Sequence, residues 1–412
     1  MSDFGDLSVS LTSIMNGSPI KNATVTLSYT GDPTEIIDEK KSDESGQIDF
    51  QHIETPPLSY STSPQDAMPY SECTLTVRAP GFKDVIISGT EILPDTTATQ
   101  AITLYTQDES APEDSVISIP DHTLYGDYPP KIPEDEVQPI DETGEIVLNR
   151  VVIPEYIVVH DGVPSDPTAA DYYIRYKDYI KNVVSSEIYA TWTPATIRAN
   201  ALAIMSFTLN RVYTEFYRNQ GYSFTITSST AYDQKWIYGR NTYQNINQIV
   251  DELFTNYLSR PGIKQPLLTQ YCDGRYTSCP YALSQWGSQS LGEQGYSAVE
   301  ILRYYYGSDI YINQTDQVSG VPYSYPNYNL TLGSRNDNVA IIQEQLNRIA
   351  KNYPAVPTVA VDGIYGPKTE AAVKKFQSIF GLPVTGVVDY TTWYKISEIY
   401  VGVTRIAELL RY

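Results

Sequence analysis

The residue best placed to do chemistry in this sequence is Glu187. It is a lone carboxylate that follows the run Val183 to Ser186 and precedes an aromatic and proline break. After the break, Thr193 suits the N-cap and Pro194 the first position of a long helix. A carboxylic acid among apolar neighbours can donate a proton to a leaving oxygen and take one back, which is general acid–base catalysis. The alternative is that Glu187 only caps or pairs at a helix end.

Cysteine and histidine are scarce, which narrows the possible chemistry. The chain has three of each, so we expect neither a disulfide framework nor a site of several histidines. Cys272 and Cys279, separated by six residues, could form a disulfide, stay as free thiols or bind zinc. Asp273 or His160 would have to complete a zinc site. Two thiols without a nearby histidine make a poor zinc site, so we favour a disulfide or free thiols and expect no cofactor.

The charge of the chain is concentrated in its first third. The 412 residues carry a net charge of −21. Residues 1–146 hold 27 acidic and 6 basic side chains, whereas residues 147–412 are balanced. An acidic chain without a basic stripe argues against nucleic acid as a partner. No apolar run approaches the ~18 residues of a membrane span, and the first residues lack the features of a classical signal peptide.

The first third divides into a folded part and a linker. Residues 1–105 show short alternating strands separated by glycine, asparagine and proline turns, which predicts an antiparallel β-sandwich. Residues 106–146 are rich in proline and acid, which predicts an exposed linker. Such a linker invites proteolysis, and we expect a processing site near Glu145 to Arg150. The alternative is a passive tether.

The remaining chain predicts two further domains. Residues 147–312 combine strands with helices expected over 169–186 and 195–219, which indicates an α+β domain. A second linker is expected over 313–329. Residues 330–412 show three stretches of helical periodicity and predict a three-helix bundle.

Three motifs resemble bacterial cell-wall proteins. YIKNVVSSEIYATWTPATIRANALAIMSFTL (residues 179–209) and CPYALSQWGSQSLGEQGYSAVEILRYYYG (residues 279–307) together resemble the core of the stage II sporulation protein D family. Members of that family cut the glycan strands of peptidoglycan. DGIYGPKTEAAVKKFQ (residues 362–377) resembles the peptidoglycan-binding domain of many wall hydrolases. Two wall motifs in one chain make cell-wall lysis the leading hypothesis.

Nearly the whole chain is similar to the SleC-type spore-cortex-lytic enzymes of clostridia. The shared features include PEYIVVH (residues 154–160), STAYDQ (residues 229–234) and an N-terminal sandwich similar to prealbumin-type modules. This resemblance implies a zymogen located in the cortex and coat region of the spore. It implies degradation of cortex peptidoglycan during germination, after a serine protease removes the N-terminal part.

The resemblance also implies roles for individual residues. Glu187 occupies the position of the family's catalytic glutamate. It would act alone in a lytic transglycosylase, because the muramyl C6 hydroxyl attacks within the substrate and no second carboxylate is needed. The expected substrate-binding residues would offer hydroxyl, amide, charged and aromatic groups to N-acetylated sugars. They are Arg198, Asn200, Tyr232, Asp233, Gln234, Tyr238, Ser284, Gln285 and Trp286.

Two other functions stay open from the sequence. At Ala195 and Met205 the family pattern carries an acidic residue and an arginine, and both are absent here. These losses would suit a peptidoglycan-binding or spore-coat protein without catalytic activity. The second alternative is an N-acetylmuramoyl-L-alanine amidase, a reaction that usually needs zinc.

Overall fold

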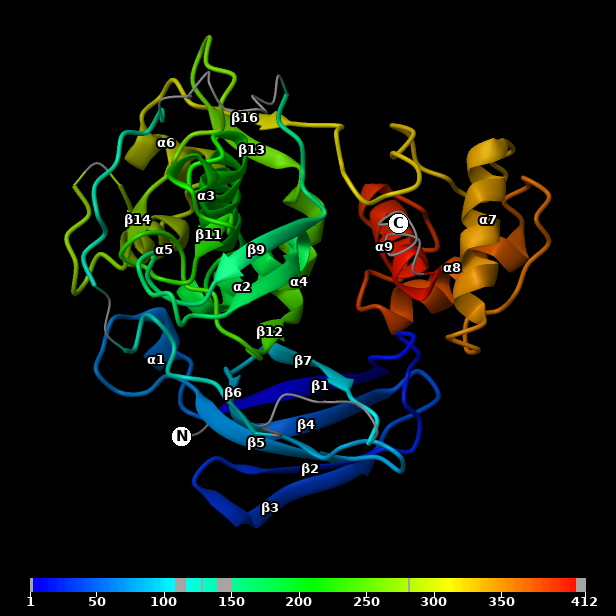
Figure 1. Cartoon of the computed structure of the whole chain (residues 1–412). Coiled ribbons are helices and arrows are strands. Elements are labelled where there is room, and N and C mark those ends of the chain that lie inside the picture. The colour runs from blue at the N-terminus through cyan, green and yellow to red at the C-terminus, as the bar shows by residue number, and fades with distance from the viewer. Residues whose placement is uncertain (1–2, 108–115, 127–128, 139–149, 281, 405–412) are drawn as a thin grey trace.

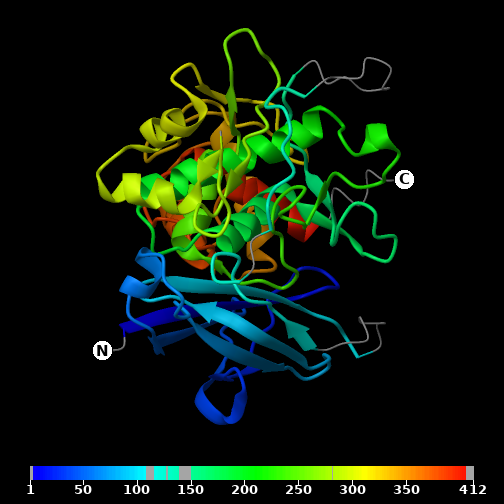
Figure 2. The same ribbon diagram turned by 90° about the vertical axis from the view of Figure 1, so that its left-hand side faces the viewer.

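Three parts follow one another along the chain and pack around a shared centre: a two-sheet sandwich, a central mixed domain and a bundle of three helices (Figures 1 and 2). The computed structural model describes residues 3–107, 116–126, 129–138, 150–280 and 282–404. In these ranges, no helix combines the length and apolar character that crossing a bilayer requires.

The sandwich is built from strands whose side chains alternate between core and surface. On β1 (Asp3–Ser13), Leu7, Val9 and Leu11 are fully buried, whereas the serines between them lie on the other face. The other elements of this part are β2 (Thr24–Tyr29), β3 (Asp32–Lys41), β4 (Gln47–Thr55), α1 (Ser59–Thr62), β5 (Ser71–Arg78), β6 (Val85–Ile92), β7 (Thr97–Leu104) and β8 (Val116–Ser118).

Both sheets of the sandwich are mixed, which corrects the predicted antiparallel arrangement. Their strand orders are β12-β7-β1-β4 and β3-β2-β5-β6-β8, where β12 is Thr242–Tyr243. β1 runs parallel to β7, and β6 runs parallel to β8. Turn residues predict antiparallel hairpins between successive strands, but they carry no information on strands that pair across a long connection. Because β12 comes from the central domain, the two parts share one sheet.

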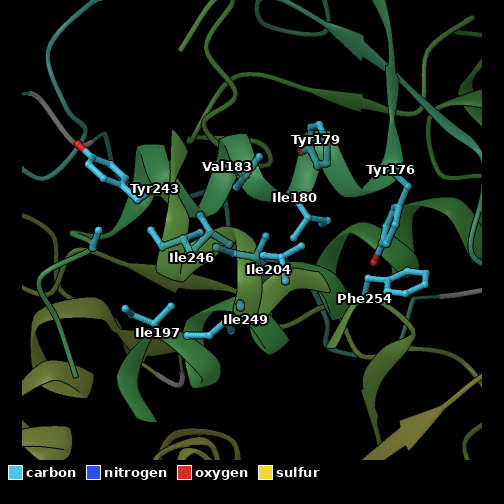
Figure 3. Packing of buried hydrophobic residues seen from close by; sticks show 14 of the residues in the cluster. Tyr176, Tyr179, Ile180, Val183, Ile197, Ile204, Tyr243, Ile246, Ile249 and Phe254 are labelled. Atoms are coloured by element: carbon cyan, nitrogen blue, oxygen red, sulfur yellow. The ribbon is translucent and has the colours of Figure 1, made fainter. Parts of the chain in front are cut away.

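The central domain surrounds one buried helix, α3 (Pro194–Tyr213). Its apolar residues occupy all sides of the helix, as expected for a helix in the middle of a core. The side chain of Thr193 accepts the backbone N–H of Thr196 (3.2 Å), so the predicted N-cap is confirmed. Figure 3 shows Ile197 and Ile204 of α3 packed among residues of α2 (Tyr176–Glu187) and α4 (Gln244–Leu253).

The other elements of the central domain are short. A three-stranded sheet has the order β10-β9-β11. The elements are β9 (Tyr156–His160), β10 (Asp171–Arg175), the 3-10 helix η1 (Arg218–Gln220), β11 (Ile226–Thr227), β13 (Asn256–Ser259), β14 (Tyr271–Cys272), β15 (Leu283–Ser284), α5 (Gln285–Glu293), α6 (Ala298–Tyr306) and β16 (Tyr311–Gln314).

Two predicted helices are shorter than expected. The stretch predicted as helix from 169 begins as strand β10, paired antiparallel with β9, and helix α2 starts only at Tyr176. The tyrosines and isoleucine of β10 favour a pleated strand once a partner is present. The second helix ends at Tyr213 rather than 219, and Glu215 adopts a left-handed backbone (φ 49°) that stops helical hydrogen bonding.

The C-terminal part contains the three predicted helices. They are α7 (Asp337–Ala350), α8 (Pro367–Ile379) and α9 (Tyr390–Thr404). Leu346, Phe376 and Trp393, one from each helix, are fully buried between them. Polar contacts also fix the bundle: Nε2 of Gln377 donates to Oγ1 of Thr392 (3.1 Å), which ties α8 to α9.

A segment of the predicted linker lies across the central domain, and we call residues 129–138 the strap. The backbone N–H of Ile132 donates to the carbonyl of Ala231 (2.8 Å). Gln265 closes two hydrogen bonds with the backbone of Gln138 (2.7 and 2.9 Å). The strap is therefore docked rather than exposed as a free tether. Residues 145–149 of the expected processing site lie outside the described residues.

Candidate active site

The carboxylate of Glu187, at the end of α2, is held by donors from three other segments. Oε1 accepts hydrogen bonds from the backbone N–H of Lys235 (2.8 Å) and the hydroxyl of Tyr271 (3.3 Å). Oε2 accepts one from Nε2 of Gln285 (3.1 Å). Donors on both oxygens fix the orientation of the carboxylate, which a group that transfers a proton at a defined atom requires.

Local structure explains how α2 brings Glu187 to this point. The helix ends there because Ile188 is extended (φ −139°, ψ 157°). Within the helix, Asn182 accepts the backbone N–H of Ile237 (3.0 Å) and donates to its carbonyl (2.8 Å). These two hydrogen bonds to the backbone of Ile237 hold the segment that contains Lys235 against the helix.

Helix α5 supplies the other wall of the site. Ser284 caps it by accepting a backbone N–H of the first turn (3.0 Å), which directs Gln285 toward Glu187. Trp286 packs on Trp192 with ring centroids 5.0 Å apart and is 8% exposed. Within the part of the chain that the structure describes, Oε1 of Gln285 and Nε1 of Trp286 are buried without a hydrogen-bond partner. The amide that donates to Glu187 thus keeps an acceptor without a partner among the described residues, which a ligand could use.

Asp233 and Gln234 are fully buried and are occupied by other parts of the fold. Asp233 accepts hydrogen bonds from Arg211 (2.7 Å), Tyr217 (2.6 Å) and both the N–H and the hydroxyl of Thr227 (2.9 and 2.7 Å). Gln234 bonds to side chains of α2 and α3. We propose that both residues position the segment that reaches Glu187, in place of the expected contact with substrate.

Arg198 and Asn200 lie on α3 and bind neighbouring helices. Arg198 pairs with Glu252 of α4 near the surface. Asn200 is buried, and its Nδ2 donates to Oγ of Ser288 on α5 (2.9 Å). Asn200 therefore sets the position of the helix that carries Gln285, which makes it a supporting residue of the site.

The two predicted tyrosines are separated from each other. Tyr232 is half-buried, and its carbonyl accepts a hydrogen bond from Arg211 (3.3 Å). Tyr238 is 40% exposed and stacks on Tyr172 of β10, with ring centroids 5.0 Å apart. The structure thus brings Gln285 to Glu187, packs the neighbouring Trp286 against Trp192, and places Tyr238 in a different cluster.

The loop before α5 is closed by a disulfide. Cys272 and Cys279 are bonded, with their Cα atoms 5.7 Å apart, so the zinc alternative is wrong for these two sulfurs. Asp273 accepts three successive backbone N–H groups of the loop (3.1, 2.6 and 2.9 Å). Among the described residues, no group of three or more histidine, cysteine, aspartate and glutamate side chains is arranged to hold a metal.

Glu187 is fully buried in this chain, and the strap lies beside it. Lys131 of the strap places its Nζ 4.5 Å from the ring centre of Tyr271 and donates to the carbonyl of Asp233. Burial lowers the pKa of Lys131 to about 8, although the carboxylates of Glu187 and Asp233 act in the opposite direction. A cation of the strap therefore lies on the residues that hold Glu187.

Sequence reasoning missed three contributors to this site. Lys235 acts through its backbone N–H, which every residue except proline has, so no side-chain signal exists. Tyr271 directly precedes Cys272 and gave no signal of its own. Lys131 did carry one, because it is the single basic residue among residues 106–146.

Two protein families match this chain. Residues 169–256 match the family of the stage II sporulation protein, and residues 335–396 match the putative peptidoglycan binding domain. The first match contains Glu187, and the second covers α7, α8 and the first part of α9. The chain therefore has a sporulation-type domain followed by a wall-binding domain, and the resemblance to both families is confirmed.

The matching curated relatives share only short segments with this chain. An autolytic lysozyme of Clostridium acetobutylicum is 52% identical over 48 residues, 12% of this chain and 13% of the relative. A zinc D-Ala-D-Ala carboxypeptidase of Streptomyces albus G is 39% identical over 70 residues, 17% of this chain and 27% of the relative. The chain thus spans less than a third of either relative.

Solved structures match about a quarter of this chain. The Bacillus anthracis TIE protein is 15% identical, with a TM-score of 0.19, over 25% of this chain and 17% of its own. Klebsiella pneumoniae 5-hydroxyisourate hydrolase is 20% identical, with a TM-score of 0.16, over 24% of this chain and 89% of its own.

Proposed function

We propose that this chain is the precursor of a cell-wall lytic enzyme that cleaves peptidoglycan glycan strands, with Glu187 as general acid and base. The observation that carries the proposal is the set of donors around Glu187 inside a sporulation-type domain. The wall-binding bundle supports peptidoglycan as the partner. The two families together favour spore cortex as the wall that is cut.

The carboxylates that adjoin the site favour a mechanism with a single acid. Asp233 is occupied by Arg211, Tyr217 and Thr227, and Asp273 by loop N–H groups. Two-carboxylate hydrolysis needs a second free carboxylate across the scissile bond. A lytic transglycosylase needs one group. Glu187 would protonate the glycosidic oxygen as the bond to C1 breaks, then accept the proton of the C6 hydroxyl as that oxygen bonds to C1, giving a 1,6-anhydro end.

The buried position of Glu187 favours a latent precursor. Substrate cannot reach a carboxylate with no exposed surface, and Lys131 of the strap lies on the ring of Tyr271, which donates to Glu187. Trp192 donates to the carbonyl of Ser61 in α1 (2.9 Å), and Arg275 pairs with Asp66 of the same region (2.5 Å). Removal of the N-terminal part by a serine protease, as the family resemblance implies, would uncover the site.

Replacing Glu187 tests the assignment. Glu187→Gln keeps the shape of the side chain but delivers no proton, so glycan cleavage should fall by about 10²–10⁴-fold. The measurement is mass spectrometry of the fragments released from cortex peptidoglycan by the processed protein. Anhydro-muramyl ends that disappear in the variant would support the proposal. Reducing ends, or free L-alanine amino termini, would show a hydrolase or an amidase instead.

A further inference from the structure

A cavity of about 2220 Å³ lies where the three parts of the chain meet. One wall is the outer face of the sheet that contains β1 and β7. The opposite wall is formed by β10, α2 and residues 235–240, and residues at the end of α8 and on α9 line a third side. The cavity thus touches the sandwich, the sporulation-type domain and the wall-binding bundle together.

The sandwich wall of the cavity is lined by hydroxyl groups. The same alternation that buries the leucines and valine of β1 turns its small polar residues outward. β7 repeats this pattern beside it. The hydroxyl-bearing residues of the two strands that line the cavity are Ser8, Ser10, Thr12, Thr97, Thr99 and Thr103.

The opposite wall carries a cluster of three aromatic rings. The ring centroids of Tyr172 and Trp236 are 5.1 Å apart, those of Tyr172 and Tyr238 are 5.0 Å apart, and those of Trp236 and Tyr238 are 6.3 Å apart. All three residues line the cavity, and Tyr238 is 40% exposed. The exposed ring of Tyr238 at the edge of this cluster is suited to a ligand with a flat apolar face.

The aromatic wall is continuous with the candidate active site. Lys235 lines the cavity, directly precedes Trp236, and gives its backbone N–H to Glu187 (2.8 Å). At the other end the cavity reaches Lys395 of α9 in the wall-binding bundle. A long ligand that contacts the bundle and the aromatic wall would therefore extend toward Glu187.

We propose that this cavity binds a segment of glycan strand in the full-length chain. Pyranose rings present a C–H face that stacks on aromatic rings and a rim of hydroxyl and acetamido groups that bonds to hydroxyls, which matches the two walls. The choice of ligand rests on the proposed function. The consequence is that the precursor holds its substrate while the strap still covers Glu187.

The test is calorimetric titration of the full-length chain with tetra-N-acetylchitotetraose. Tyr238→Ala and Tyr172→Ala should each weaken binding by about tenfold, and Tyr238→Phe should keep the affinity because the ring remains. Tyr304→Ala is the matched control, since Tyr304 on α6 is 66% exposed and lies outside the cavity lining. Tyr238→Ala removes the contact with Tyr172 and should lower the unfolding temperature slightly, so thermal unfolding of each variant confirms that the fold is kept at the titration temperature. Repeating the titration in a Glu187→Gln background separates binding from the proposed catalysis.

Three outcomes would overturn the glycan site. The first is equal affinity in Tyr238→Ala, Tyr304→Ala and the parent chain. The second is a loss in Tyr238→Phe as large as in Tyr238→Ala. The third is a free wall stem peptide that binds with the same dependence on Tyr238. An unchanged titration by Glu187→Gln, together with unchanged glycan cleavage, would refute the role of Glu187 and leave the glycan site standing.

Discussion

Gln285 is the side chain whose loss should slow proton transfer with little effect on the fold. It is the donor to Oε2 of Glu187 (3.1 Å), and its own Oε1 is buried without a partner among the described residues. Replacing it with leucine removes this donor to Oε2, so the carboxylate is oriented less firmly, and a misplaced reacting group costs about 100-fold. In the processed protein, we expect kcat of Gln285→Leu to fall by this order, with a smaller change in KM.

The control for Gln285→Leu is Gln294→Ala at the exposed C-cap of the same helix. It should leave both kinetic constants unchanged. If Gln285→Leu raised KM alone, the residue would bind substrate without orienting Glu187. If neither constant changed, the hydrogen bond would have no role in the reaction.

At the scale of elements, the contact between α5 and α3 should tolerate no added atom at Gly292. A Cβ at Gly292 would lie 2.1 Å from Oγ1 of Thr196 and 2.3 Å from Oγ1 of Thr193. The helices must separate, and overpacking of this kind lowers the free energy of unfolding by about 1–3 kcal/mol. Thermal unfolding of Gly292→Ala should show the loss. Gly402→Ala on α9, where no atom lies within 4 Å, should be neutral or stabilising.

The strap is the element whose docking should control latency. Glu134 accepts two hydrogen bonds from the guanidinium of Arg211 (2.8 and 2.5 Å), and Glu136 accepts two from Arg260 (2.7 and 2.8 Å). Glu134→Gln combined with Glu136→Gln should loosen the strap, so the uncleaved chain should gain activity on cortex fragments. Asp135→Asn is the control, because Asp135 lies between them and is exposed.

Two outcomes would contradict a role of the strap in latency or latency itself. If the double variant stayed as inactive as Asp135→Asn before cleavage, the sandwich rather than the strap would keep the enzyme latent. Equal activity of the parent chain before and after proteolysis would contradict the zymogen proposal as a whole.

At the scale of the whole molecule, the wall-binding bundle is joined to the central domain by a buried charge cluster. Lys177 of α2 pairs with Asp251 of α4 (3.1 Å) and with Glu398 of α9. Lys181 also pairs with Asp251 (2.8 Å), and Lys395 with Glu398 (2.7 Å). Three helices from two domains thus share one network, which fixes the bundle relative to α2.

This network predicts that the stability of the two joined domains falls at acidic pH. Burial raises the pKa of Asp251, but the ammonium groups of the three lysines outweigh burial and lower this pKa from 3.8 to about 2. A carboxylate whose pKa is lower in the folded state stabilises the fold fully above pH 3.8, and that stability is lost as the pH falls through 2. Unfolding temperatures measured from pH 6 to 2 should show this fall.

Asp251→Asn provides the comparison for this fall of stability at acidic pH. At neutral pH it leaves buried lysines without this partner, and breaking a buried pair costs about 3–5 kcal/mol of unfolding free energy. The variant should unfold at a lower temperature at pH 6 and lose less on acidification than the parent. If unfolding temperature fell with pH in parallel for the two proteins, Asp251 would not be the group that causes the loss of stability in acid.

The sequence by itself determined the local features of this protein. The alternation of apolar residues identified the sandwich strands, and Thr193 and Pro194 marked the start of α3, because these signals act between near neighbours. The motif around Glu187 identified the sporulation-type domain, and residues 362–377 identified the wall-binding domain. The pairing of Cys272 with Cys279 was one of the two outcomes that the sequence favoured, the other being free thiols.

Only the tertiary structure decided which groups meet. It paired β1 with the distant β7 in parallel, aimed the N–H of Lys235 and the amide of Gln285 at Glu187, and committed Asp233 to Arg211. It also laid Lys131 of the predicted linker against the site. These contacts join segments separated by tens of residues. Their geometry depends on how whole elements pack, and no local pattern of residues encodes that packing.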